Sequence, residues 1–214
     1  MQIKICGITT ENEIKLLNEN HVDYAGFVFF EKSKRNISPA EAEAIFPRLD
    51  RNIRKVGVTV SPDVKLVETL QDTGIDILQV HKELSREVLR AAKVPVWYAF
   101  NVADPEELAR KQCFFGELPE NLSEKIQAIV VDGANFGSGV TFDWKQRIDK
   151  EALDTIFGKR KFILAGGLRS SNVQEGMDIF HPDVVDVSSG VEGESGKKEK
   201  ELIEEFVRKV REHE

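Results

Sequence analysis

The chain has 214 residues, of which 41% are hydrophobic and 31% are charged, enough for one large α/β domain with a substantial core. Its net charge of −7 argues against general nucleic-acid binding, which needs a basic surface, and fits an enzyme that stays dispersed in solution. No stretch approaches the ~20 apolar residues of a membrane-spanning helix, no signal peptide is visible, and Cys6 and Cys113 give no disulfide framework, so a reduced, cytoplasmic protein is expected.

Eight short apolar runs recur along the chain. They are rich in Val, Ile and Phe and are mostly continuous rather than alternating, as is typical of parallel strands that are covered on both faces. The predicted strands are residues 3–6, 24–29, 55–60, 76–80, 95–100, 127–131, 161–165 and 184–188.

Helical patterns separate these runs. Several open on capping residues, and the last, over residues 198–212, carries one apolar stripe. The stripe consists of Leu202, Ile203, Phe206, Val207 and Val210. The candidate helix starts are Thr10 with Glu13, Ser38-Pro39 with Glu41, Ser61-Pro62, and Ser171 with Gln174. Residues 103–111 look helical, but 113–125 do not form one clear element, so an irregular excursion is expected within 103–125.

Eight strands alternating with helices, without a linker or a low-complexity segment, predict a single domain over residues 1–214. A closed (β/α)8 barrel, or TIM barrel, and an open doubly wound sheet both satisfy this alternation. Eight units in just over 200 residues favour the compact α/β barrel. No G-x-G-x-x-G motif follows the first strand, which argues against a dinucleotide-binding open sheet.

In such a barrel the chemistry lies at the C-terminal ends of the strands. Each side chain there has an ordinary structural alternative: an inert buried thiol, a helix cap, a solvated surface charge or a histidine packed at the rim. The residues concerned are Cys6, the 31–35 segment with Arg35, His81, Asp132 before the glycine-rich 133–139, Gly166-Gly167, and Ser188-Ser189-Gly190.

Each of these groups could bind or react with a substrate only under particular conditions. Two small-residue loops on adjacent strands, around Gly166-Gly167 and Ser189-Gly190, favour phosphate binding over simple tight turns. A free thiol has a pKa of ~8.5, so Cys6 could act as a base only beside a cation or dipole. Asp132 could act as an acid only with a raised pKa. Arg35 could clamp a carboxylate.

Seven segments in order carry a family resemblance. They are KICGIT (4–9), GFVFFEKSKRNISP (26–39), VGVTV (56–60), LQVH (78–81), Asp132 before GSG (137–139) and FDW (142–144), LAGGL with NV (164–168, 172–173), and DVSSGVE (186–192). Together they make the chain resemble the phosphoribosylanthranilate isomerases, which are (β/α)8 enzymes of tryptophan biosynthesis.

The resemblance implies an Amadori rearrangement of N-(5-phosphoribosyl)anthranilate to 1-(2-carboxyphenylamino)-1-deoxyribulose 5-phosphate. It implies that Cys6 is the general base, with Gly7 letting the backbone turn beside it, and that Asp132 is the general acid. Arg35 would hold the anthranilate carboxylate. The other substrate contacts would be His81, Gly166, Gly167, Ser188, Ser189 and Gly190, with the glycine and serine loops on the phosphate.

No step of this reaction requires a metal or a redox cofactor, and the sequence offers no ligand cluster for one. The expected partner is the small phosphorylated substrate, with no nucleic acid or membrane, and the chain could be a monomer or a homodimer. Lys82 stands where the family commonly has glycine; it could add charge near the site, although pointing to solvent is favoured. The loop after Asp132 is also altered.

Three alternatives compete with this assignment. The related histidine-pathway isomerase performs the same chemistry with an aspartate as its first-strand base, so Cys6 argues against it. The lysine and glutamate set of indole-glycerol-phosphate synthase is not evident. A barrel that binds without turnover would be expected to have lost at least one of Cys6, Asp132 and Arg35.

Overall fold

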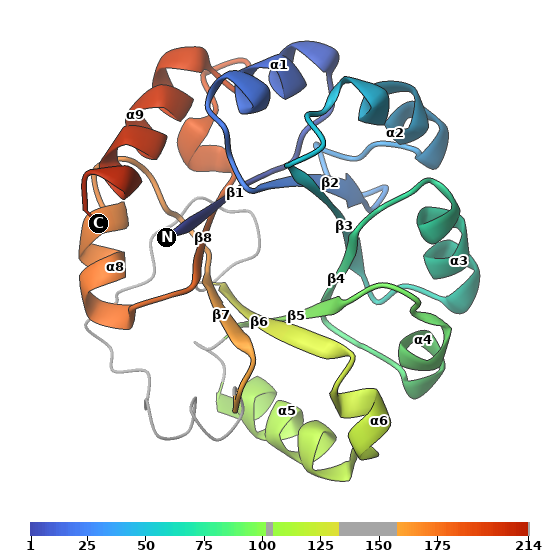
Figure 1. The fold of residues 1–214 in the computed structure, drawn as a ribbon. Helices are drawn as coiled ribbons and strands as arrows, with labels where there is room; N and C mark the ends of the chain where they lie inside the picture. Colours follow the sequence, from blue (N-terminus) through green and yellow to red (C-terminus); the bar gives the residue numbers. More distant parts are fainter. Residues whose placement is uncertain (102–104, 133–157, 214) are drawn as a thin grey trace.

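Eight parallel strands close into a barrel in the order β1 to β8, with helices around the outside (Figure 1). The structure is a computed structural model, and it describes residues 1–101, 105–132 and 158–213. The strands are β1 (Gln2–Cys6), β2 (Tyr24–Phe29), β3 (Arg54–Val60), β4 (Ile77–His81), β5 (Val96–Asn101), β6 (Ile126–Asp132), β7 (Lys161–Leu164) and β8 (Val184–Val187). The (β/α)8 prediction is confirmed, and each strand lies within one residue of its predicted bounds.

The helices follow the strands and form the outer layer. They are α1 (Glu11–Glu19), α2 (Pro39–Ile45), α3 (Val64–Asp72), α4 (Arg86–Ala91), α5 (Pro105–Glu117), α6 (Glu120–Ser123), α8 (Val173–Phe180) and α9 (Lys200–Arg211), with 3-10 turns η1 (Phe46–Arg48) and η2 (Ser189–Val191). Within the described ranges, no helix has the length and apolar character needed to span a bilayer. The glycine-rich 133–139 segment lies outside the described residues.

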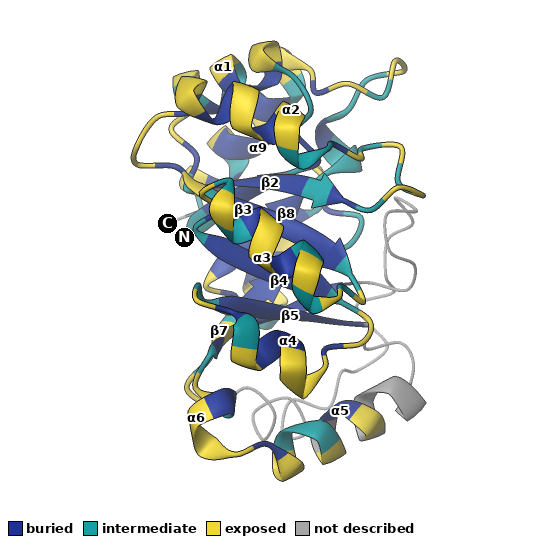
Figure 2. Ribbon diagram, turned by 90° about the vertical axis from the view of Figure 1, so that its right-hand side faces the viewer, coloured by how far each residue is buried: buried dark blue, intermediate teal, exposed yellow. Residues whose placement is uncertain are grey.

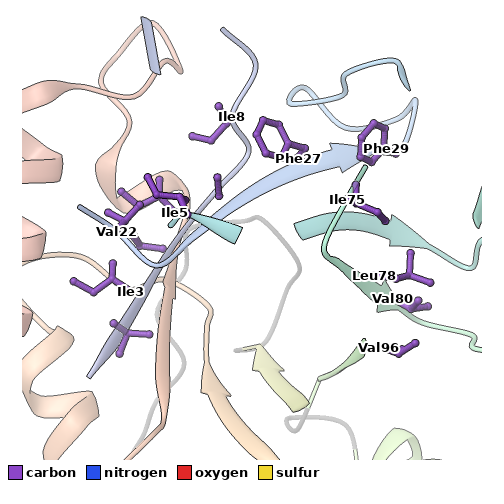
Figure 3. Packing of buried hydrophobic residues seen from close by; sticks show 14 of the residues in the cluster. Ile3, Ile5, Ile8, Val22, Phe27, Phe29, Ile75, Leu78, Val80 and Val96 are labelled. Carbon is purple, nitrogen blue, oxygen red and sulfur yellow. The ribbon is translucent and has the colours of Figure 1, made fainter. Parts of the chain in front are cut away.

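Strand side chains alternate between two cores because successive residues of a strand point to opposite faces. One cluster fills the barrel interior, with Tyr24 and Trp97 packed edge to face at 4.9 Å between ring centroids. The larger cluster lies between the strands and the helices, where Ile5 and Phe27 are fully buried (Figure 3). Figure 2 shows the result: the strands are buried and the outer faces of the helices are exposed.

Two predicted helix starts are confirmed and two are wrong. Thr10 and Ser38 each form a capping box. Ser61, however, follows β3 with φ +45, and its Oγ accepts a hydrogen bond from the N–H of Glu83, so Asp63 caps α3 instead. In place of Ser171, Asn172 precedes α8. The apolar stripe of α9 is confirmed, because four of its five residues are buried.

The irregular excursion predicted within residues 103–125 is wrong where the structure describes this segment. Helix α5 continues through Cys113 to Glu117, and α6 follows it directly. The cause is tertiary packing, since Phe114 and Phe115 contact Tyr98 on β5 at 5.6 and 6.3 Å between ring centroids. These aromatic contacts extend the helix past residues whose local pattern does not favour it.

Candidate active site

A cavity of about 580 Å³ opens at the C-terminal ends of the strands. Its lining includes every predicted site residue except Gly190, together with several polar residues that had not been assigned a role. The predicted residues in the lining are Cys6, Arg35, His81, Asp132, Gly166, Gly167, Ser188 and Ser189. Residues far apart in sequence are therefore brought to one place by the closure of the barrel.

Cys6 is the last residue of β1 and lies beside Gly26 of β2, with which it pairs. A Cβ atom at Gly26 would lie 2.8 Å from the Cys6 Sγ, so only glycine leaves room for the thiol. Lys4 occupies the same inward face two residues earlier and is completely buried. Burial raises the pKa of the Cys6 thiol, and the charge of Lys4 opposes this shift. Lys4 is thus the cation that a thiol base requires.

The Lys4 ammonium forms a buried ion pair with Asp186 of β8, at 2.6 Å from Nζ to Oδ2. The other oxygen of Asp186, Oδ1, is buried and accepts no hydrogen bond from the described residues. Asp186 also lines the cavity. The barrel interior directly beneath the cavity is therefore charged, although the rest of its filling is largely apolar.

Asp132 ends β6, and only 8% of the residue is exposed. Within the described part of the chain its Oδ1 receives no hydrogen bond. Burial, followed by the charge of Asp186, raises the pKa of Asp132 to about 7, although Lys4 acts in the opposite direction. At neutral pH this carboxyl group therefore carries a proton in a large share of the molecules, as a general acid must.

His81, at the end of β4, is neutral. Burial, followed by the charges of Lys4 and Lys111, lowers its pKa to about 3. Its Nε2 lies 2.8 Å from the side-chain nitrogen of Gln79. With that amide donating, the Nε2 atom accepts, and the ring proton is on Nδ1. His81 can therefore donate a hydrogen bond but does not exchange protons near pH 7.

Arg35 follows β2 and crosses the turn at Gly7. Gly7 has φ +85, which confirms the predicted backbone turn, and a Cβ atom there would lie 2.3 Å from the Arg35 Cδ. The Arg35 side chain is 11% exposed and its guanidinium is bound by Glu192, with 2.8 Å between Nη2 and Oε2. Glu192 had not been predicted as a site residue. The arginine thus reaches the cavity already paired.

The two glycine-containing loops after β7 and β8 touch each other. A Cβ atom at Gly190 would lie 1.9 Å from the carbonyl oxygen of Leu168, so glycine is required there. Gly166 and Gly167 have φ of +86 and +67. No acceptor among the described residues takes the N–H groups of Gly167 or Gly190. Because Gly167 lines the cavity, the loop after β7 offers a backbone donor there, as an anion site requires.

Two polar side chains brace these loops. Asn172 donates from Nδ2 to the carbonyl oxygen of Gly167 at 3.0 Å and accepts from the N–H of Arg169 at 2.8 Å. Ser188 donates its hydroxyl proton to the carbonyl oxygen of Cys6 at 2.9 Å. The Ser188 hydroxyl therefore ties β8 to β1, while the loop's backbone faces the cavity.

Lys82 lies at the mouth of the cavity with an exposed side chain and φ +62. Its carbonyl oxygen accepts hydrogen bonds from the Tyr98 hydroxyl at 2.9 Å and the Lys111 Nζ at 2.6 Å. The prediction that Lys82 points to solvent is confirmed, and the same side chain also adds positive charge to the rim. The buried Lys111 fixes its backbone in a conformation that favours glycine.

Sequence reasoning missed five parts of this site: Lys4, Asp186, Gly26, Glu192, and Lys198, whose Nζ lies 2.8 Å from the Glu192 carboxylate. A usable signal exists for the first two, because each is a charged residue inside an apolar strand, two positions before a predicted site residue. In residues 1–101, 105–132 and 158–213, no three His, Cys, Asp or Glu side chains are grouped so as to hold a metal ion.

Known proteins give consistent matches. A family model described as N-(5'phosphoribosyl)anthranilate (PRA) isomerase matches residues 3–209. The N-(5'-phosphoribosyl)anthranilate isomerase of Streptococcus mutans serotype c is 34% identical over 211 residues, covering 98% of this chain and 98% of its own length.

Solved structures agree with these matches. Monomers generated from the dimeric phosphoribosylanthranilate isomerase of Thermotoga maritima align over 99% of this chain and 98% of theirs, with 31% identity and a TM-score of 0.79. A phosphoribosyl anthranilate isomerase in complex with reduced 1-(o-carboxyphenylamino)-1-deoxyribulose 5-phosphate aligns over 99% of both chains, with 30% identity and a TM-score of 0.80.

Proposed function

The chain belongs to the N-(5'-phosphoribosyl)anthranilate isomerase family, and we propose that Cys6 and Asp132 carry out the two proton transfers of its reaction. As a member of this family, it isomerises N-(5-phosphoribosyl)anthranilate to 1-(2-carboxyphenylamino)-1-deoxyribulose 5-phosphate in tryptophan biosynthesis. The observation that carries the proposal is the raised pKa of Asp132, about 7, in a cavity that also contains a thiol beside a buried lysine.

Asp132 is the general acid. Its proton passes to the furanose ring oxygen, the bond from that oxygen to C1′ breaks, and the nitrogen lone pair forms a Schiff base. A pKa near 7 suits this step because the acid is protonated at working pH yet releases its proton readily.

Cys6 is the general base. Its thiolate removes the C2′ proton of the Schiff base, and the electron pair of that C–H bond neutralises the iminium nitrogen and gives an enolamine. The enolamine then tautomerises to the ketone. Lys4 favours the thiolate form of Cys6 and so offsets part of the rise in pKa that burial causes.

The remaining cavity residues bind the two charged ends of the substrate. Arg35 pairs with the anthranilate carboxylate, and the N–H groups of Gly166-Gly167 and Ser189-Gly190 hold the phosphate. Ser188 supports this loop through its bond to Cys6. His81, as a neutral imidazole, gives the sugar one polar contact.

Residues 1–214 form one (β/α)8 domain that requires only its phosphorylated substrate, without a cofactor, a metal, nucleic acid or a membrane. It acts as a monomer or a homodimer; one relative is described as a dimer. A cytoplasmic location fits its two free cysteines and its net charge of −7.

The test is the loss of anthranilate-derivative fluorescence on turnover, with substrate made from anthranilate and phosphoribosyl pyrophosphate. Cys6→Ser and Asp132→Asn are each expected to lower turnover by about 10²–10⁴-fold, as loss of a general acid or base does. Cys113→Ser is the matched control, because that thiol is exposed on α5. Undiminished turnover by Cys6→Ser would exclude the thiol as the base.

A further inference from the structure

Glu192, just after η2, is a charged residue that the proposed chemistry does not use, although it pairs with Arg35 and Lys34, two residues of the cavity lining. Its side chain is only 4% exposed. Three cationic side chains surround its carboxylate: Arg35, Lys198 at 2.8 Å and Lys34 at 3.3 Å. Burial alone would raise the pKa of Glu192, but hydrogen bonds from Arg35 and Lys198 lower it to about 2. The carboxylate is therefore charged at every physiological pH.

The pairing with Arg35 uses one edge of the guanidinium group. The two carboxylate oxygens of Glu192 accept from Nε and from Nη2. A guanidinium carries five N–H groups, so three remain, on Nη1 and Nη2. No acceptor from the described residues takes the Nη1 protons, and Arg35 lines the cavity. The remaining edge has two parallel N–H groups, which is the geometry that binds a second carboxylate in bidentate fashion.

Lys198 fixes Glu192 from the other side. Its Nζ is buried and donates to Glu192 and also to the carbonyl oxygen of Ser188 at 3.0 Å. Glu192 is thereby anchored to the end of β8, beside the loop proposed for the phosphate. The arginine cannot swing toward solvent without abandoning a carboxylate that is held in place.

We propose that Glu192 is a positioning residue, which grips the Nε–Nη2 edge of Arg35 so that the Nη1–Nη2 edge is presented to the aromatic carboxylate of the substrate. This deepens the proposed function and rests on the carboxylate-binding role of Arg35. Glu192 makes no contact with the substrate itself. Its effect is to spare the substrate the cost of ordering a long side chain, which is the general benefit of preorganisation.

The experiment compares Glu192→Gln with wild type, using two ligands. The neutral amide keeps the shape but turns an N–H toward the guanidinium, so the KM for N-(5-phosphoribosyl)anthranilate should rise about 10- to 100-fold, as expected for loss of a charged hydrogen bond. The kcat should change by less than about threefold, because the carboxylate is bound alike in ground and transition states. Ribose 5-phosphate has the sugar and phosphate but no carboxylate, so its Ki should stay within about threefold of wild type.

Two further variants make the test specific. Glu212→Gln makes the same change in an Arg–carboxylate pair outside the cavity lining, 2.8 Å from Arg208 and 51% exposed, and should leave KM within about twofold of wild type, as is usual for exposed ion pairs. In an Arg35→Met background, Glu192→Gln should have no additional effect on KM, because Glu192 acts through that arginine.

The outcomes separate this inference from the role of Arg35. An equal rise in the KM of the substrate and the Ki of ribose 5-phosphate would overturn it and make Glu192 a purely structural residue. A fall in KM would also overturn it, because Glu192 would then compete with the substrate for Arg35. If Arg35→Met alone left KM unchanged, the carboxylate clamp itself would be wrong, whatever the Glu192 result.

Discussion

Replacing Gly26 by alanine tests whether the position of the Cys6 thiol governs turnover. The added Cβ atom would lie 2.8 Å from the Cys6 Sγ, 3.0 Å from its Cα and 3.1 Å from its Cβ. Favourable contacts between such atoms begin at about 3.5 Å, so the thiol must move by roughly 0.7 Å. Because backbone is also too close, strands β1 and β2 must separate slightly.

Both activity and stability should respond. A misplacement of about 1 Å at a reacting group costs about 10²-fold in rate, so we expect kcat/KM of Gly26→Ala to fall by about 30- to 100-fold. Overpacking of a core costs about 1–3 kcal/mol of unfolding free energy, which leaves a folded protein. The catalytic loss should thus appear under conditions where circular dichroism shows the native barrel.

Gly116→Ala is the matched control. Gly116 lies in α5 with nothing within 4 Å of an added Cβ atom, so alanine there should stabilise the protein by about 0.5–1 kcal/mol and leave turnover unchanged. Turnover is measured by the fluorescence assay and stability by urea unfolding. If Gly26→Ala remained folded with turnover within twofold of wild type, the assignment of Cys6 as the base would be refuted.

Four other changes have defined outcomes. Lys82→Gly should raise the unfolding free energy by about 1 kcal/mol, because Lys82 has φ +62, a conformation that is strained for a residue with a side chain. A lower unfolding free energy for this variant, measured by urea unfolding, would contradict that strain. Gly190→Ala, which places a Cβ atom 1.9 Å from the Leu168 oxygen, should raise the Ki of inorganic phosphate by more than about tenfold, as loss of a charged hydrogen bond does; an unchanged Ki would remove this loop from the phosphate site. Lys4→Met should lower the unfolding free energy by about 3–5 kcal/mol at pH 7, because it leaves Asp186 buried without its cation. A decrease of less than about 1 kcal/mol would show that Asp186 is protonated instead. The pKa of Asp132 is about 7 in the folded state, against 3.8 for the ordinary group. Between these two pH values the folded state binds more protons than the unfolded state. The unfolding free energy of wild type should therefore fall as the pH rises, by up to about 4 kcal/mol. Asp132→Asn should lack this loss, so its advantage over wild type should grow from pH 4 to 7; a constant difference in unfolding free energy would refute the raised pKa.

The strands and the residues at their ends could be predicted from the sequence because both depend on local pattern. A continuous run such as YAGFVF indicates a strand covered on both faces, and it forms β2 over the predicted residues. Once eight such runs are placed in a barrel, each run delivers its last residue to the same face. The confluence of Cys6, His81 and Asp132 around one cavity follows from topology alone.

The contacts that tune these residues could not be predicted in the same way. Lys4 meets Asp186 across 182 positions, and Arg35 meets Glu192 across 157, so no local window contains either pair. Helix α5 shows the same limit. Its second half is helical because aromatic rings from β5 pack on it, and a distant strand is invisible to a reading of residues 113–117.

The buried ion pair beneath the cavity is better explained by catalysis than by stability, because a well-packed apolar pair in its place is often as stable or more so. The two charges of this ion pair affect Cys6 and Asp132 differently. For the Cys6 thiol, Lys4 is the larger charge effect, and it lowers the pKa more than Asp186 raises it. For Asp132 the order is reversed, and Asp186 raises the pKa more than Lys4 lowers it. One dipole therefore favours a thiolate on one side of the cavity and a protonated carboxyl group on the other. The proposed base, Cys6, and the proposed acid, Asp132, must be ready at the same pH, and they require these two states together.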